Sequence, residues 1–202
     1  MRLHKLFLVV VSATALFAAL ASTASAGRLS QSSQTLRATF REVRFRLPFG
    51  TTNCAVTLEG TLHSGSIRKV AGTLMGYITR AAVTTTCLSG SATILSETLP
   101  WHVQYESFTG TLPNILTIRT RVIGSSFRVR EPNGITCLAR STTTEPALGT
   151  YEREAGGALS GVVIGGRIRV GSECLGATGE FTSDRGTVTV LNSTTRISVT
   201  LI

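Results

Sequence analysis

The chain has 202 residues and a formal net charge of +9, with 20 basic side chains against 11 acidic ones. A hydrophobic content of 42% excludes an intrinsically disordered polyelectrolyte, and a chain of this length can bury one sizeable core. The sequence contains no Gly-x-x-x-x-Gly-Lys phosphate loop, no dinucleotide-binding glycine motif and no Gly-x-Ser-x-Gly nucleophile motif, so these enzyme classes are not indicated.

The first 26 residues have the three parts of an export signal. Basic residues Arg2 and Lys5 precede an apolar run over residues 6–20, and small residues at 24–26 form a cleavage pattern. We therefore expect a signal peptide over residues 1–26, cleaved or retained, and a protein that is secreted or located in the cell envelope. No second apolar run of spanning length follows, so we expect no transmembrane anchor after cleavage.

Residues 27–35 are polar and are expected to form a flexible leader, followed by a single all-β domain over residues 36–202. Apolar residues alternate from Leu36 to Phe40 and then resume on the opposite parity at Val43. This change of parity predicts a β-bulge between Phe40 and Val43.

A proline-flanked aromatic stretch lies near the middle of the chain, over residues 99–113. With a period of two, Trp101, Val103 and Tyr105 share one face, while His102 lies on the other. We expect a core-forming strand here. The alternative is a binding groove lined by Trp101 and Tyr105.

The clearest hairpin follows, because strand-like alternation ends at Arg130 and a Pro-Asn-Gly turn occupies residues 132–134. Residues 145–157 are polar and predict a long loop or short helix. The apolar, glycine-rich segment 159–170 predicts two buried strands that turn at Gly165 and Gly166. No 12-residue segment has a helical period, so we predict an antiparallel β-sandwich or a small Greek-key barrel.

Four cysteines occur in the domain, and an even number in an exported chain indicates disulfides. Three pairings are possible, and we favour Cys54–Cys87 with Cys137–Cys174 because both loops are local. A zinc site assisted by His63 or His102 is the alternative, but no Cys-x-x-Cys spacing supports it, and we expect neither metal nor cofactor. The similar spacing of Cys54 from Cys137 and of Cys87 from Cys174 also suggests a weak internal duplication.

Arginine pairs separated by two residues are the most specific functional hint. Each pair would lie on one strand face, and if such strands are neighbours, the guanidinium groups would form a basic stripe. We therefore expect a contact with an anionic envelope polymer or surface, and no nucleic acid as natural partner, because the protein is exported. The candidate binding residues are Arg44, Arg46, Arg119, Arg121, Arg128, Arg130, Trp101 and Tyr105, and the pair Arg167 and Arg169 has the same spacing.

No catalytic constellation is evident. His102 and Glu106 share a strand face but would be about 13 Å apart along a strand, which is too far for direct contact. Glycoside cleavage would need two carboxylates held close together, and pairs such as Glu152 with Glu154 are available. We expect a non-catalytic binding or structural role, and the alternative is a secreted hydrolase that uses His102 or a glutamate pair.

The stretch Leu-Pro-Trp-His-Val-Gln-Tyr-Glu-Ser-Phe-Thr-Gly-Thr-Leu-Pro at residues 99–113 resembles a pattern in uncharacterised exported proteins of actinobacterial type. The resemblance extends to Cys54 and Cys87. The order of cysteine, Thr-Leu-x-Gly, cysteine and Leu-Pro-Trp is similar, more loosely, to exported proteins of the alkane-oxidation-activator type. The resemblance implies export but no activity, so it assigns no functional residue.

Overall fold

The computed structural model describes residues 27–84 and 87–202, so the expected signal peptide at 1–26 lies outside the described residues. The described residues form antiparallel strands and two short 3₁₀ helices, which confirms the predicted all-β class. In chain order the elements are β1 (Arg28–Gln31), β2 (Thr35–Leu47), β3 (Gly50–Leu62), β4 (Ser66–Arg68), β5 (Leu74–Val83), β6 (Ser91–Ile94), η1 (Ser96–Thr98), β7 (Trp101–Thr111), β8 (Asn114–Ile123), β9 (Ser126–Arg130), β10 (Thr136–Arg140), β11 (Ala147–Arg153), β12 (Leu159–Val170), η2 (Ser172–Cys174), β13 (Thr178–Ser183), β14 (Thr187–Val190) and β15 (Val199–Leu201).

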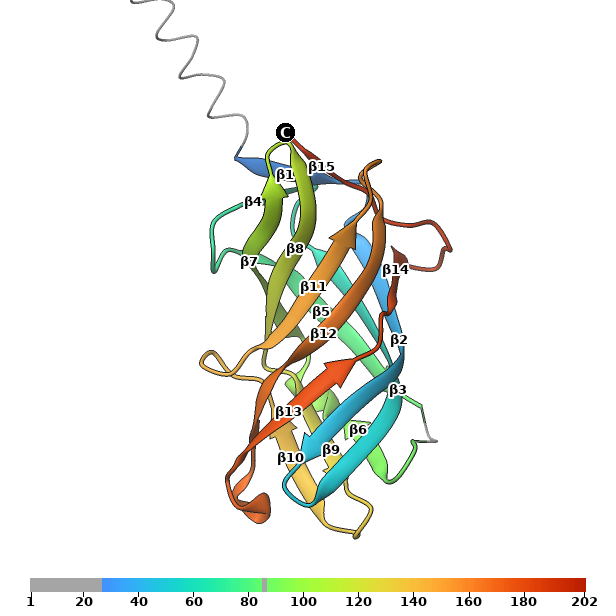
Figure 1. Ribbon diagram of the computed structural model, residues 1–202, viewed down its shortest axis with the longest axis vertical. Helices are drawn as coiled ribbons and strands as arrows, with labels where there is room; N and C mark the ends of the chain where they lie inside the picture. The colour runs from blue at the N-terminus through green and yellow to red at the C-terminus, as the bar shows by residue number, and fades with distance from the viewer. Residues whose placement is uncertain (1–26, 85–86) are drawn as a thin grey trace, which may run out of the picture.

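Eight of these strands close into a barrel (Figure 1). Each barrel strand pairs with the next one in the series β2, β3, β5, β7, β8, β11, β12 and β13. The pairing of β13 with β2 closes the ring. Because each barrel strand pairs with the next barrel strand along the chain, the barrel has an up-and-down order instead of a Greek-key order. In the part of the chain described, no helix has the length and hydrophobicity to cross a membrane.

Strand β12 is shared by two regions of the molecule. Up to Gly165 it pairs with β11, and from Arg169 it pairs with β10, which leads through β9 to β6. The predicted turn at Gly165 and Gly166 is therefore wrong, because β12 continues through both residues. Gly166 has a φ of +140°, and a Cβ there would lie 3.0 Å from the carbonyl oxygen of Pro146, so the glycine permits a close approach where the strand changes partner.

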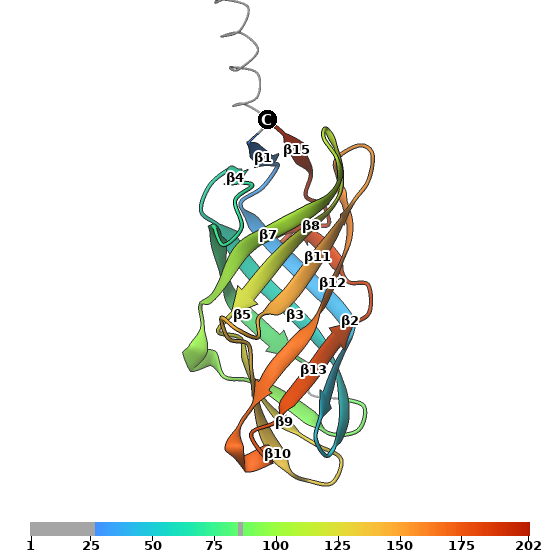
Figure 2. The same ribbon diagram turned by 60° about the vertical axis from the view of Figure 1, so that its left-hand side comes forward.

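The two ends of the molecule differ in what closes them (Figure 2). At one end, which we call the capped end, β15, β1 and β4 form a separate three-stranded sheet across the barrel. At the other end, which we call the lower end, β6, β9 and β10 extend the main sheet. The predicted flexible leader over residues 27–35 is wrong, since it includes β1, where Leu29 is fully buried between β4 and β15.

The aromatic stretch is a core strand and not a groove. Trp101 and Tyr105 project inward from β7 and are 1% and 2% exposed, so neither can be the binding residue that the alternative required. The ring centroid of Phe127 lies 5.4 Å from that of Trp101 and 5.1 Å from that of Phe45. These rings join β7, β9 and β2 across the interior and supply much of its buried apolar area.

Other local predictions meet mixed outcomes. The register of β2 against β3 shifts between Phe40 and Val43, which confirms the predicted bulge. The hairpin at residues 132–134 joins β9 to β10, as predicted. The polar segment 145–157 is not a loop or helix throughout, because β11 occupies most of it and pairs with β8 and β12.

The favoured cysteine pairing is confirmed, since disulfides join Cys54 to Cys87 and Cys137 to Cys174, which removes the zinc alternative. The first disulfide holds β3 against the segment before β6, and the second holds β10 against η2. The predicted duplication would equate Cys54 with Cys137. However, Cys54 lies on β3 between β2 and β5, whereas Cys137 lies on a short strand between β9 and β12, so their surroundings are unlike.

Candidate anion-binding surface

Two of the four arginine pairs lie on strands that the fold brings together. Arg128 and Arg130 lie on β9, Arg167 and Arg169 lie on β12, and β10 runs between the two strands and adds Arg140. All five side chains are exposed and alternate with inward-facing core residues. They therefore share the outer surface of β9, β10 and β12, which we call the arginine face.

The register places like charges directly opposite one another on the arginine face. Arg140 and Arg169 are Cα partners across β10 and β12. Opposite residues of an antiparallel pair have Cβ atoms about 5 Å apart, and like charges in these positions are destabilising. The arrangement therefore concentrates positive charge at a cost in folding stability.

Carboxylates at the edge of the arginine face are bound elsewhere. Glu180 is the cross-strand partner of Arg167, but its Oε2 lies 3.9 Å from Nη1 of Arg46 on the far side. The Oε1 atom of Glu173 accepts a hydrogen bond of 2.6 Å from the backbone N–H of Leu138. Within the described residues, no side chain of the arginine face forms an ion pair or hydrogen bond.

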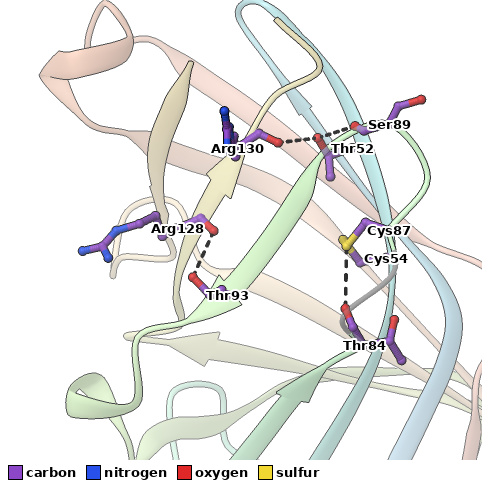
Figure 3. Close-up of a disulfide and its surroundings, with 8 residues drawn as sticks. All are labelled: Thr52, Cys54, Thr84, Cys87, Ser89, Thr93, Arg128 and Arg130. Carbon is purple, nitrogen blue, oxygen red and sulfur yellow. Dashed lines mark hydrogen bonds between the residues drawn. A yellow bond between two sulfur atoms is a disulfide. The ribbon is translucent and has the colours of Figure 1, made fainter. Parts of the chain in front are cut away.

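The backbone beneath these free side chains is held in place (Figure 3). The hydroxyl of Thr93 on β6 donates to the carbonyl oxygen of Arg128 at 3.4 Å. The hydroxyl of Thr52, which is fully buried, lies 3.0 Å from the carbonyl oxygen of Ser89 and 3.4 Å from that of Arg130. Arg128 extends away from the Cys54–Cys87 disulfide in this view. A backbone fixed by the disulfide and these hydrogen bonds therefore presents a guanidinium group without an ion pair in the described part of the chain.

One buried acid lies at the end of the arginine face. Glu131 follows Arg130 and is 2% exposed, with Oε1 3.3 Å from the Sγ of Cys137 and Oε2 without a hydrogen-bond partner. Burial raises the pKa of this carboxyl group, and a hydrogen bond from the backbone of Phe49 partly opposes the increase. Because the group is directed into the core, it does not neutralise the arginine face.

The other two predicted arginine pairs have partners of their own, although Arg46 lies next to the arginine face, since Glu180 is the Cα partner of both Arg46 and Arg167. On β2, Nη2 of Arg44 lies 2.8 Å from Oε1 of Glu42, and Arg46 is the residue beside Glu180. On β8, Nε of Arg119 lies 3.8 Å from Oε2 of Glu106. Arg121 donates to the carbonyl oxygen of Thr143 at 2.6 Å. These four arginines thus have partners within the chain.

The residues of the hydrolase alternative also have defined positions. His102 is exposed on β7, and its ring centroid lies 5.3 Å from that of Tyr77. Glu152 and Glu154 contact arginines, with Oε2 of Glu152 2.7 Å from Nη2 of Arg185. No group of three or more His, Cys, Asp or Glu that could hold a metal occurs within residues 27–84 and 87–202.

Sequence reasoning missed Arg140, because it has no arginine two residues away and only the pairing of β10 with β12 places it in the group. Comparisons with protein-family models, with curated proteins and with solved structures find no match for this chain.

Proposed function

We propose that this protein is an exported, non-catalytic binding module that holds an anionic polymer of the cell envelope on its arginine face. The observation that carries the proposal is a set of five exposed arginines on three adjacent strands, whose side chains form no ion pair within the described residues. The guanidinium group forms paired, charge-assisted hydrogen bonds with phosphate and carboxylate oxygens, so repeated anionic groups are the matching chemistry.

The strand geometry favours a polymer over a single small anion. Arginines two residues apart on one strand are separated by about 6.8 Å, and neighbouring strands by about 4.8 Å, so the positive charges form a two-dimensional array. Several weak contacts along one polymer add up through a high effective concentration. An anionic group between Arg140 and Arg169 would also relieve their mutual repulsion.

Two further features support a site of action outside the cytoplasm. Disulfides persist in oxidising compartments, and the chain has two of them. The sequence also begins with the pattern of an export signal. The hydrolase alternative has no comparable support, because His102 is exposed beside Tyr77 and the paired glutamates are bound to arginines.

The test measures binding of long-chain polyphosphate and of polygalacturonate at several salt concentrations. The variant Arg140→Gln/Arg169→Gln removes two charges from the arginine face. The matched control Arg185→Gln/Arg196→Gln removes the same number of charges at exposed arginines that form ion pairs with Glu152 and Glu154. Comparing the two polymers distinguishes phosphate from carboxylate recognition.

We expect binding to weaken steeply as salt is added, because the contacts are electrostatic. The arginine-face variant should lose about tenfold in affinity, equivalent to about 1.4 kcal/mol, while the Arg185→Gln/Arg196→Gln control changes by less than about twofold. Equal losses in both variants would reduce the effect to net charge and overturn the proposal, as would the lack of salt-dependent binding to either polymer.

A further inference from the structure

An internal cavity lies at the capped end of the barrel, away from the arginine face. It has a volume of about 70 Å³ as measured for the centres of water-sized molecules. Its wall includes residues from β2, β3, β5, β7, β8, β11, β12 and β14, so it surrounds the barrel axis. The cap strands β1, β4 and β15 contribute Gln31, Ile67 and Val199 to the same wall.

The wall of this cavity is apolar almost everywhere. Its side chains include Ile118, Leu159 and Val188, and the first and last of these are 4% and 2% exposed. A volume of this size would admit about five to seven waters, but each water needs two to four polar partners. The wall does not offer them, so water is a poor occupant and a hydrocarbon is a good one.

One polar pair in the wall could orient an occupant. The hydroxyl groups of Thr120 and Tyr151 are hydrogen-bonded to each other, and Thr120 lies 3.5 Å from the carbonyl oxygen of Gly149. Burial raises the pKa of Tyr151, so its phenol stays neutral at physiological pH. The pair can therefore exchange a hydrogen bond with one neutral hydroxyl or carbonyl group, but it offers no charge to bind an ion.

The cap is held without a disulfide, by strand pairing and hydrogen bonds. It is held by three Cα pairs between β1 and β15, three between β1 and β4, and backbone hydrogen bonds such as that from Arg28 to Ile202. The side chain of Gln31 adds a bond of 2.5 Å to the carbonyl oxygen of Ser64. Neither disulfide includes a cap residue, so local separation of short strands gives a ligand an entry route.

From this cavity we propose a second binding site, specific for a small neutral apolar molecule with an unbranched chain of about six carbons and one hydroxyl or carbonyl group. The chain fills the space between Ile118 and Val188, and its polar end contacts Tyr151. This site is independent of the arginine face, because the two involve different strands except for β12.

The experiment titrates the full domain with a series of straight-chain 1-alkanols from four to twelve carbons, followed by calorimetry and by NMR of methyl groups. The variant Ile118→Phe fills the cavity. The matched control Ile168→Phe makes the same substitution at a buried position, 3% exposed, outside the cavity wall. Contacts between alkanol protons and the methyl groups of Val188 provide a measurement on the unmodified protein.

We expect saturable binding that is strongest near six carbons and declines for the longest chains. Ile118→Phe should weaken it at least about tenfold, while folded Ile168→Phe stays within about twofold of the unmodified protein. The proposal is overturned if no alkanol gives saturable shifts at Val188, or if Ile118→Phe binds as well as the unmodified chain. Polyphosphate binding should be unchanged in Ile118→Phe, so this site and the arginine face can fail separately.

Discussion

The lower end and the capped end of the barrel are built from the same kind of strand but are stabilised in different ways. The lower end has both disulfides and the aromatic contacts of Phe127 with Trp101 and Phe45. The capped end relies on short strands and hydrogen bonds above a cavity. A cross-linked framework suits an array of fixed charges, and an end without a disulfide suits a ligand that must enter.

Removing the Cys137–Cys174 disulfide should have the largest effect on stability. Cys137 and Cys174 are fully buried and close a loop of 37 residues, so Cys137→Ala/Cys174→Ala should lower the free energy of unfolding by about 3–4 kcal/mol. Urea unfolding followed by circular dichroism measures the change.

The control for this prediction is Cys54→Ala/Cys87→Ala, which opens a loop of 33 residues of similar entropy. Cys87 is only partly buried, so this pair should cost less, because its sulfur atoms have fewer packing contacts to lose. A greater loss from this pair than from the first would contradict the view that the lower end depends most on Cys137 and Cys174. In both variants, the molecules that remain folded should still bind 1-hexanol at the capped end.

The buried carboxyl group at the lower end should give a smaller, pH-dependent effect. Because the pKa of Glu131 is raised in the folded state, its protonated form favours folding, and its contribution is complete below its unfolded pKa, near 4.5. That contribution is lost as pH rises through the raised folded pKa. Glu131→Gln should therefore reduce the decline in stability between about pH 4.5 and neutrality, as measured by urea unfolding at several pH values.

Glu180→Gln is the control for this measurement, because Glu180 is exposed beside Arg46 at the same end of the molecule. It should leave the loss of stability between pH 4.5 and neutrality intact. A pH profile of Glu131→Gln identical to that of the unmodified chain would show that Glu131 does not supply this dependence.

Short-range pattern was sufficient to predict much of the fold. Alternation identified β7, and a parity change located the bulge at Phe40 and Val43. The errors arise where the deciding contact is distant in sequence. Strand β1 looks like a polar leader until β15, at the opposite end of the chain, pairs with it and buries Leu29. In the sequence Gly166 looks like a turn residue, but in the fold it lets β12 change its pairing partner.

The candidate site was predictable only in part, for the same reason. A spacing of two places Arg128 with Arg130 on one face of a strand, but it cannot state which strands are neighbours. The strand order determines that β9 meets β12 through β10, and that β2 meets β12 through β13, which places Glu180 between Arg46 and Arg167. The cavity has no sequence signal at all, since its wall is made from residues of seven barrel strands, β14 and three cap strands.

The smallest expected effect separates function from stability on the arginine face itself. Arg140→Thr removes one of two directly opposed positive charges and introduces a residue that favours strands, so the free energy of unfolding should rise by about 0.2–1 kcal/mol at low salt. Added salt should reduce the gain by screening the repulsion. Arg44→Thr makes the same substitution where Glu42 lies 2.8 Å away, and it should give no such gain. If Arg140→Thr both stabilises the fold and weakens polyphosphate binding, the opposed arginines reduce stability in exchange for binding; if it destabilises the fold, the charges of the arginine face are not in conflict.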